Sequence, residues 1–244
     1  MEAAEYELMD SAEESMWWYR AVHDRIEDIL KRSLSRPSRI LDAGCGTGGL
    51  LARLKECLPQ HFSVGMDIDP GAGRRAAEKC KSPLVIASVN RLPFHAAAFD
   101  ALLSIDVLSS EGVDETAALS DAHACLKPGG ILVINLPAFG WMMSDHDRRV
   151  HNARRYRSQV RALLLANGFR PISVFHWNSV LFPLMVLRRK VFRPGNARSD
   201  VLDYPPLVNR LFAGALALEH RLASAGISFP FGGSVMAVAA RSDE

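Results

Sequence analysis

Cysteine is scarce in this sequence, and its few residues form no recognisable site. None of the four lies in a CxxC pair or has histidines at metal-binding spacing, so neither a disulfide framework nor a metal site is predicted. The first fourteen residues hold six acids and no lysine or arginine, the opposite of a signal or transit peptide. We therefore expect reduced thiols in a cytoplasmic protein. The cysteines are Cys45, Cys57, Cys80 and Cys125.

Long hydrophobic runs and a large excess of one charge are also missing. The most apolar run, Val180 to Leu187, is interrupted by Pro183 and is far shorter than the roughly 20 residues that cross a bilayer. The 29 basic and 27 acidic residues nearly cancel, which argues against a nucleic-acid partner. With 48% hydrophobic and 23% charged residues, the 244-residue chain has the composition of a soluble globular domain.

What the sequence does contain is a regular alternation of strand-like and helix-like segments. Apolar runs at 39–43, 62–66, 84–87, 101–105 and 131–136 alternate with helical patterns at 49–57, 71–81 and 114–126. Residues 169–177 and the final FGGSVMAVAAR predict two more strands. The pattern predicts an α/β fold, a doubly wound, mostly parallel sheet of seven strands with helices on both faces.

Three segments lie outside this alternation. Residues 1–35 predict an N-terminal helical cap, built on an amphipathic helix over 13–33, before a main domain at 36–244. Residues 137–157 form a loop longer than most structural connections, followed by a helix at 157–167. Residues 179–231 predict a helical insertion between the last two strands, with a helix near 207–225.

A glycine-rich turn follows the first strand. Gly44, Gly46 and Gly49 fit GxGxxG, and Asp67 ends the second strand, where an acid commonly binds ribose hydroxyls. Glycines at such a turn let backbone amides approach a ligand closely. A nicotinamide dinucleotide and S-adenosylmethionine are the two cofactors that this pattern suits.

Two observations favour S-adenosylmethionine. A short-chain dehydrogenase would need Tyr-xxx-Lys, yet Val160 stands four positions after Tyr156 and no other tyrosine has lysine there. In addition, Asp42 places a carboxylate at the end of the first strand, which suits a cationic ligand better than a pyrophosphate. A sulfonium that carries an ammonium group is such a ligand.

At this point a family resemblance is clear. The segments ILDAGCGTGG, GMDIDP, RLPFHAAAFDALLSIDVL and LKPGGILVINLP resemble successive motifs of the class I S-adenosylmethionine-dependent methyltransferases and cover residues 38–137. MWWYR, HDRRVHNARRY, NSVLFPL and PFGGSVMAVA are similar to a bacterial subgroup associated with polysaccharide, lipid or secondary-metabolite pathways. The resemblance implies a Rossmann-like fold and O- or N-methylation of a small-molecule acceptor by in-line displacement.

The resemblance also implies a set of cofactor contacts. Gly44 and Gly46 would lie against the methionine part, Asp42 would face its ammonium group, and Asp67 would accept both ribose hydroxyls. Ser88 stands where many relatives carry an acid for the adenine amino group. The predicted cofactor-binding residues are Tyr19, Arg20, Asp42, Gly44, Gly46, Asp67, Ile68, Ser88, Val89, Asn90 and Ile105.

Candidate catalytic groups lie mainly in the loop over 137–157. His146 and His151 are candidate bases, with Asp145 or Asp147 orienting one of them, and Tyr156 is a candidate hydrogen-bond donor to substrate. The alternatives are solvated loop histidines and a helix-packing tyrosine. Two further hypotheses concern Asp106, as a group near the transferred methyl or a helix-start acid, and the loop arginines, as anion ligands or partners of the acidic N-terminus. These arginines are Arg148, Arg149, Arg154 and Arg155.

The stretch from Leu181 to Arg193 is apolar at first and basic at its end. It predicts either a buried helix with a basic cap or an interfacial helix on an anionic membrane, and the second interpretation favours a lipid-linked acceptor. The predicted partner is a small-molecule acceptor, anionic or lipid-linked; no metal is predicted, and the sequence gives no oligomeric state. Intramolecular cyclisation with the same cofactor and a non-catalytic cofactor-binding subunit are the alternative functions.

Overall fold

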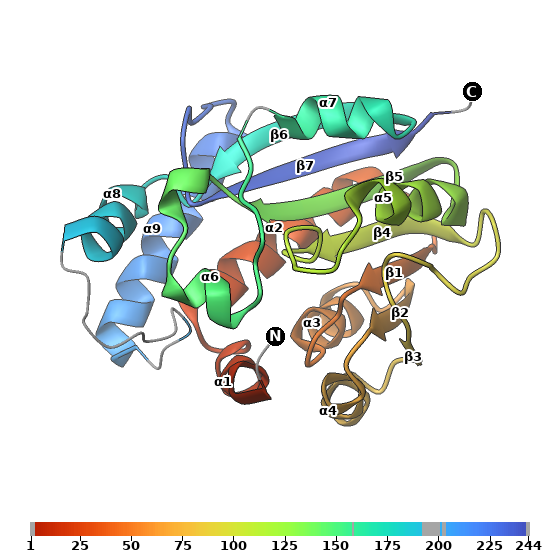
Figure 1. Ribbon diagram of the computed structural model, residues 1–244, viewed down its shortest axis with the longest axis horizontal. Helices are drawn as coiled ribbons and strands as arrows, with labels where there is room; N and C mark the ends of the chain where they lie inside the picture. Colours follow the sequence, from red (N-terminus) through yellow and green to blue (C-terminus); the bar gives the residue numbers. More distant parts are fainter. Residues whose placement is uncertain (1–2, 158, 192–200, 202–203, 243–244) are drawn as a thin grey trace.

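The computed structural model describes residues 3–157, 159–191, 201 and 204–242 (Figure 1). The helices are α1 (Ala3–Ala12), α2 (Trp17–Ser33), α3 (Gly49–Cys57), α4 (Pro70–Cys80), α5 (Glu115–Cys125), η1 (Gly140–Met142), α6 (Asp145–Arg149), α7 (Gln159–Ala166), α8 (Phe182–Val186), η2 (Leu187–Val191) and α9 (Pro206–Ser224). The strands are β1 (Arg39–Ala43), β2 (Phe62–Asp67), β3 (Leu84–Ile86), β4 (Phe99–Ile105), β5 (Leu126–Pro137), β6 (Phe169–Trp177) and β7 (Ser234–Arg241).

The strands form a seven-stranded sheet in the order β3-β2-β1-β4-β5-β7-β6. β1 to β5 pair in parallel, whereas β7 runs antiparallel between β5 and β6, with Ile131 opposite Ala240 and Pro137 opposite Ser234. The predicted doubly wound, mostly parallel sheet is therefore confirmed.

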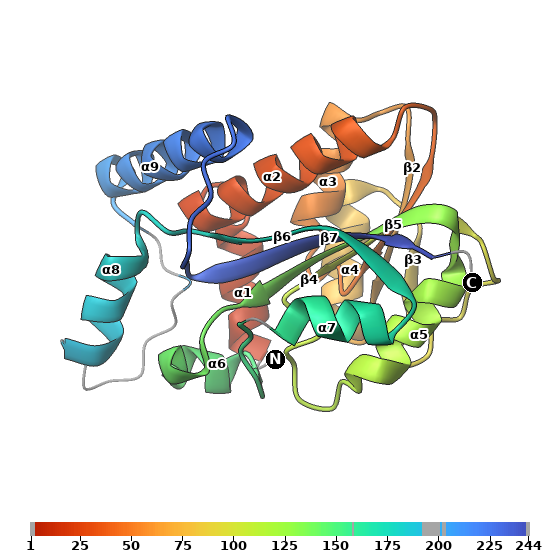
Figure 2. The ribbon, with the colours of Figure 1, turned by 90° about the horizontal axis from the view of Figure 1, so that it is seen from above.

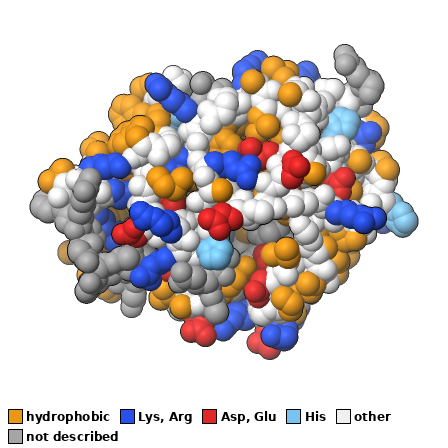
Figure 3. All heavy atoms as spheres, in the orientation of Figure 1, with side chains coloured by type: hydrophobic (Ala, Val, Ile, Leu, Met, Phe, Trp, Pro, Cys, Tyr) orange, Lys and Arg blue, Asp and Glu red, His pale blue; other side chains and the backbone are white. Residues whose placement is uncertain are grey.

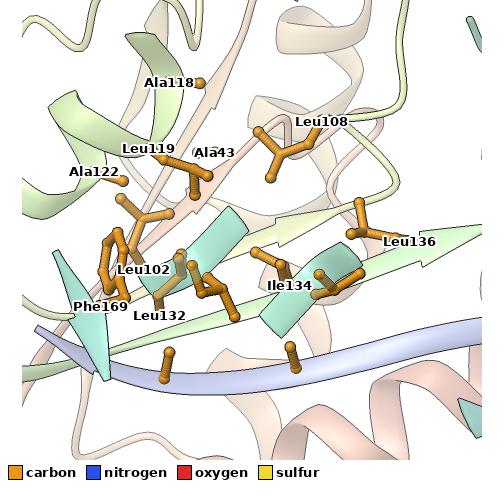
Figure 4. Close-up of a cluster of buried hydrophobic side chains, with 14 of the residues drawn as sticks. Ala43, Leu102, Leu108, Ala118, Leu119, Ala122, Leu132, Ile134, Leu136 and Phe169 are labelled. Carbon is orange, nitrogen blue, oxygen red and sulfur yellow. The ribbon is translucent and has the colours of Figure 1, made fainter. Parts of the chain in front are cut away.

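Helices cover both faces of the sheet because successive strand residues point to opposite sides (Figure 2). On β4, Leu102 faces α5 and α7, while Leu103 faces α2 and α3. Figure 4 shows the first of these layers, in which Leu119 of α5 packs over Leu102 and Leu132. α9 packs on the outer side of α2, so this part of the insertion is attached to the second layer, whereas Phe182 of α8 belongs to the first.

The structure differs from the sequence prediction in three segments. The acidic N-terminus forms the helix α1, and the loop over 137–157 contains η1 and α6. β5 begins at Leu126, five residues before the expected strand, because Leu126 already pairs with Phe99 of β4; a register shift with Gly129 at φ +69° precedes the pairing of Ile131 with Ala101. The division into a cap at 1–35 and a main domain at 36–244 stays a prediction. None of the helices in the described part of the chain could cross a membrane.

Candidate active site

The turn after β1 is shaped by glycines that no other residue could replace without strain. Gly44 has φ +93°, and a Cβ atom there would lie 2.2 Å from a γ-carbon of Val107. Gly46 has φ +53°, and its N–H donates to Asp67 Oδ2 at 2.8 Å. Asp67 Oδ1 accepts a second bond from the N–H of Asp69 at 2.9 Å. The turn and the end of β2 are thus joined around a carboxylate.

A cavity of about 510 Å³ opens beside this turn, at the carboxyl ends of the parallel strands. Its volume is in the range of small-molecule sites, and its position is where open α/β sheets bind ligands. α1, α2, α6 and η2 contribute to its wall, and Figure 1 shows α1 and α6 near the strand ends. The predicted cofactor residues that line it are Tyr19, Asp42, Gly44, Gly46, Asp67, Ile68, Ser88, Val89 and Ile105.

The turn side of the cavity is acidic. Burial, together with the nearby charges of Asp67 and Glu13, raises the pKa of Asp42 to about 7. Burial also raises the pKa of Asp67, although the N–H groups of Asp69 and Gly46 oppose this shift. The pKa of Glu13 is raised by burial too, despite its bond to Lys79. Burial and mutual repulsion disfavour the charged forms of these three carboxyl groups, and a bound cation would stabilise them. This side of the cavity therefore suits a cationic ligand.

Helix α1 supplies residues that the sequence prediction missed. Tyr6 lies near Asp67, and burial followed by the charges of Asp67 and Asp69 raises the pKa of its phenol. Tyr6, Met9 and Glu13 all line the cavity. Their spacing of three and four residues is a helical signal in the sequence.

The other side of the cavity contains His146, His151 and a buried ion pair. The carboxylate of Asp147 is fully buried and lies 2.7 Å from Arg155 Nη2, while Arg189 Nη1 lies 3.6 Å away. Although burial disfavours its charge, the guanidinium of Arg155 and then that of Arg189 hold the pKa of Asp147 below its usual value. Asp147, a candidate for orienting one of the histidines, therefore pairs with two arginines of the cavity wall.

Asp106 lies where β4 enters the cavity, in the left-handed conformation at φ +58°. Its Oδ1 accepts from Asn135 Nδ2 at 2.9 Å, and Asn135 Oδ1 accepts from Trp177 Nε1 at 2.7 Å. Burial raises the pKa of Asp106 to about 7 against the opposing effects of Arg155 and Asn135. Its orientation is thus fixed by a buried hydrogen-bond chain.

Three predicted site residues are not part of the described cavity lining. Arg20 is exposed on α2. Asn90 bonds to Gly112 O at 2.8 Å and to the N–H of Asp114 at 3.0 Å, so it holds loops together. Tyr156 is buried and donates to Leu108 O at 3.0 Å, with Glu115 Oε1 at 2.6 Å.

Three of the four loop arginines also lie outside this lining and form ion pairs with acids. Arg148 pairs with Asp145 at 2.7 Å, and Arg154 pairs with Glu115 at 2.8 Å. Arg149 lies 3.9 Å from Glu5 of α1, as the pairing hypothesis expects. Arg155 is the one of the four in the described cavity wall.

Comparisons with known proteins agree with this geometry. Residues 40–130 match the family described as "Methyltransferase domain". A malonyl-[acyl-carrier protein] O-methyltransferase from Geobacter sulfurreducens is 25% identical over 221 residues, which are 82% of this chain and 80% of the relative. The enzyme of the same name from Dechloromonas aromatica is 35% identical over 98 residues, but these span only 40% of this chain and 36% of that relative.

Residues 40–130 belong to the methyltransferase domain family, and these matches support an S-adenosylmethionine-dependent methyltransferase. The fold of this methyltransferase is similar to that of geranyl diphosphate C-methyltransferase from Streptomyces coelicolor, solved with S-adenosyl-L-homocysteine, at a TM-score of 0.61. The two chains are 13% identical, and the match covers 89% of this chain and 79% of the other. The cofactor of this methyltransferase is S-adenosylmethionine.

Proposed function

We propose that the methyltransferase transfers a methyl group from S-adenosylmethionine to an oxygen or nitrogen of a small, anionic acceptor. The observation that carries the proposal is the continuity of the cavity, which joins the glycine turn and Asp67 to the arginine-bearing wall at Arg155. A methyl transfer in line needs donor and acceptor in one enclosed space, and positioning alone can contribute roughly 7–11 kcal/mol.

The cofactor residues fit S-adenosylmethionine by shape and charge. The turn at Gly44 and Gly46 leaves room that side chains would fill, and Asp42 offers a carboxylate to an ammonium group. Asp67 offers both oxygens to ribose hydroxyls, and Ile68, exposed at 67%, offers an apolar surface to adenine. When bound, the cofactor supplies a methyl group on a positively charged sulfur.

The opposite wall suits an acceptor with a carboxylate or phosphate. Arg155, Arg188 and Arg189 line it, and Arg155 is already bonded to Asp147 and to Ala138 O. We therefore assign the anionic group of the acceptor to Arg188 and Arg189, since guanidinium groups suit planar anions. The Geobacter relative's name specifies a malonyl thioester, whose free end is a carboxylate. Two buried atoms without a partner among the described residues also belong to cavity-lining side chains, Trp17 Nε1 and Asn178 Oδ1. They offer a donor and an acceptor to the substrate.

A hydroxyl or ammonium acceptor must lose a proton, whereas a carboxylate need not. We propose that the base that accepts this proton is Asp106 or one of the histidines His146 and His151, all of which line the cavity. Asp106 is the better placed because its orientation is fixed by Asn135. Tyr156 has no direct role in this proposal, since its hydroxyl is engaged with Glu115.

The test is analysis of turnover products by mass spectrometry. The protein is incubated with S-adenosylmethionine and, in turn, malonyl-coenzyme A, a hydroquinone and an amino sugar. S-adenosylhomocysteine formed together with a methylated acceptor supports methyl transfer. Formation of methylthioadenosine would instead indicate the cyclisation alternative, and cofactor binding without any product across a broad panel would indicate a non-catalytic subunit.

A further inference from the structure

The helical stretch formed by α8 and η2 turns its apolar stripe outward. Leu184, Leu187 and Val191 recur at helical spacing and are exposed at 46%, 41% and 65%. Val180, in the bend before α8, is exposed at 48%. A helix on the surface of a globular protein ordinarily buries such a stripe against the core. The prediction of a buried helix with a basic cap over 181–193 is therefore not met at Leu184, Leu187 and Val191, and residues 192–193 lie outside the described part of the chain.

The inward side of the same stretch is fixed by specific contacts. Phe182 is 8% exposed, and its ring centroid lies 5.4 Å from that of Phe139. Arg189 donates to Met142 O at 2.9 Å and is only 9% exposed at its side chain. Met185 and Arg189 line the cavity. Rotating the helix to bury the stripe would remove a buried arginine from Asp147, so the outward orientation is set by the packing beneath.

Aromatic and basic side chains border the stripe. Trp141 and Phe231 are 52% and 42% exposed, and both ring centroids lie within 6 Å of Phe182, at 5.9 Å and 5.7 Å. The ammonium of Lys190 lies 6.0 Å from the Trp141 ring centroid. Lys190 is exposed, whereas Arg188 and Arg189 line the cavity, and residues 179–191 contain no acid. We call this the α8 surface: Trp141, Val180, Leu184, Leu187, Lys190, Val191 and Phe231.

We propose that the α8 surface binds the face of an anionic lipid bilayer. Apolar stripes beside basic residues partition into the headgroup region of anionic membranes, and tryptophan and phenylalanine add area at that depth. Lys190 near such a surface contributes favourable electrostatic energy, and no acid in 179–191 opposes it. In Figure 3, hydrophobic and basic side chains lie near one another at the upper left, in the region where Figure 1 places α8.

The inner side of this stretch lines the cavity, so a bilayer there would lie beside the acceptor chamber. This connection rests on the proposed function and favours an acceptor with a lipid tail and an anionic head. The membrane contact itself needs neither cofactor nor acceptor. The membrane-binding test can therefore fail while the proposed methyl transfer is supported, and methyl transfer can fail while membrane binding is observed.

The test is co-sedimentation of the purified full chain with phosphatidylcholine vesicles, with and without phosphatidylglycerol. We expect binding only with phosphatidylglycerol, and a decrease of binding with added salt. The double substitution Leu187→Glu and Val191→Glu should weaken partitioning about tenfold or more, and Lys190→Glu about fivefold. Leu165→Glu on α7, where the leucine is 56% exposed, is the matched control and should bind as the wild type does.

A second readout locates the contact. Vesicles with brominated acyl chains should quench tryptophan fluorescence in the wild type and much less in Trp141→Phe. Circular dichroism checks that each variant is folded. Absence of wild-type binding, or equal binding by the wild type and the double variant, would overturn the proposal. So would a dimer in sedimentation velocity that Leu187→Glu dissociates, since a second copy would then cover the α8 surface.

Discussion

The carboxylate of Asp67 already accepts hydrogen bonds from Gly46 and Asp69, which fix it at the edge of the cavity. Removing it leaves the ribose hydroxyls without a charged acceptor. Because a hydrogen bond to a charged group contributes about 1.5–3 kcal/mol, Asp67→Ala should weaken S-adenosylmethionine binding roughly ten- to a hundredfold in equilibrium dialysis. Asn90→Ala is the control, because Asn90 bonds to Gly112 and Asp114 and lies outside the described cavity lining. The dissociation constant of this variant for S-adenosylmethionine should stay within about twofold of the wild-type value. Equal losses in the two variants would contradict the assignment.

Asp42 gives the cofactor affinity a pH dependence. Burial beside Asp67 and Glu13 raises the pKa of Asp42 to about 7, so the free protein holds a proton there below that pH. A bound ammonium favours the charged carboxylate, and binding must then release the proton. Affinity should therefore fall as pH drops through 7, by about tenfold per unit at most, and level off above it. Calorimetry in a pH series checks this, and Asp42→Asn should flatten the profile; an unchanged slope in that variant would contradict it.

Among the elements, α9 is anchored by one buried carboxylate. Glu219 accepts from the N–H groups of Asn178, Ser179 and Val180 at 2.7, 2.7 and 2.9 Å, and it pairs with Arg25 of α2 at 3.1 Å. This network joins α9 and α2 to the end of β6. Asn178, which lines the cavity, is held in its left-handed conformation by the same contacts.

Breaking this network should be costly. Glu219→Ala leaves a buried guanidinium unpaired and should lower the free energy of unfolding by about 3–5 kcal/mol in urea titrations. Leu218→Ala, beside it on the exposed face of α9, should change it by less than about 0.5 kcal/mol. A similar small loss in both variants would show that the insertion is held by other contacts.

The strands were predictable because local patterns fix them, whereas α1 and α8 depend on tertiary contacts. The runs at 39–43 and 62–66 are apolar and end at a glycine turn and an aspartate, which local chemistry can identify. α1 is acidic and resembles a solvated tail until Arg75, Lys79 and Arg149 neutralise it. The sequence of an apolar stripe such as that of α8 does not determine whether the stripe faces the core or the solvent.

The same limit applies to the candidate site. The turn residues and Asp67 could be located because their motif is contiguous along the chain. Tyr6, by contrast, reaches Asp67 from a helix sixty positions away, and only the folded chain brings the two together. Conversely, Tyr156 lies in a conspicuous motif, but its hydroxyl bonds to Leu108 and Glu115 instead of facing the cavity.

Over the whole molecule, near-neutral charge conceals a separation. The 29 basic and 27 acidic residues leave a net charge of +2. Among the described cavity residues, the cofactor turn carries carboxylates and no arginine, whereas the opposite wall carries three arginines together with Asp106 and Asp147. This arrangement matches a cationic cofactor on one side and an anionic acceptor on the other. The described cavity lining runs from Glu5 in α1 to Ser234 in β7, so both ends of the chain must be folded to form it.

The most direct measurement is calorimetric titration of the wild-type chain with S-adenosylmethionine at pH 8, where Asp42 is charged. The cavity and its acidic turn predict saturable binding at one site per chain, and S-adenosylhomocysteine should compete for that site. A folded protein that gives no saturable binding of either compound would contradict the account.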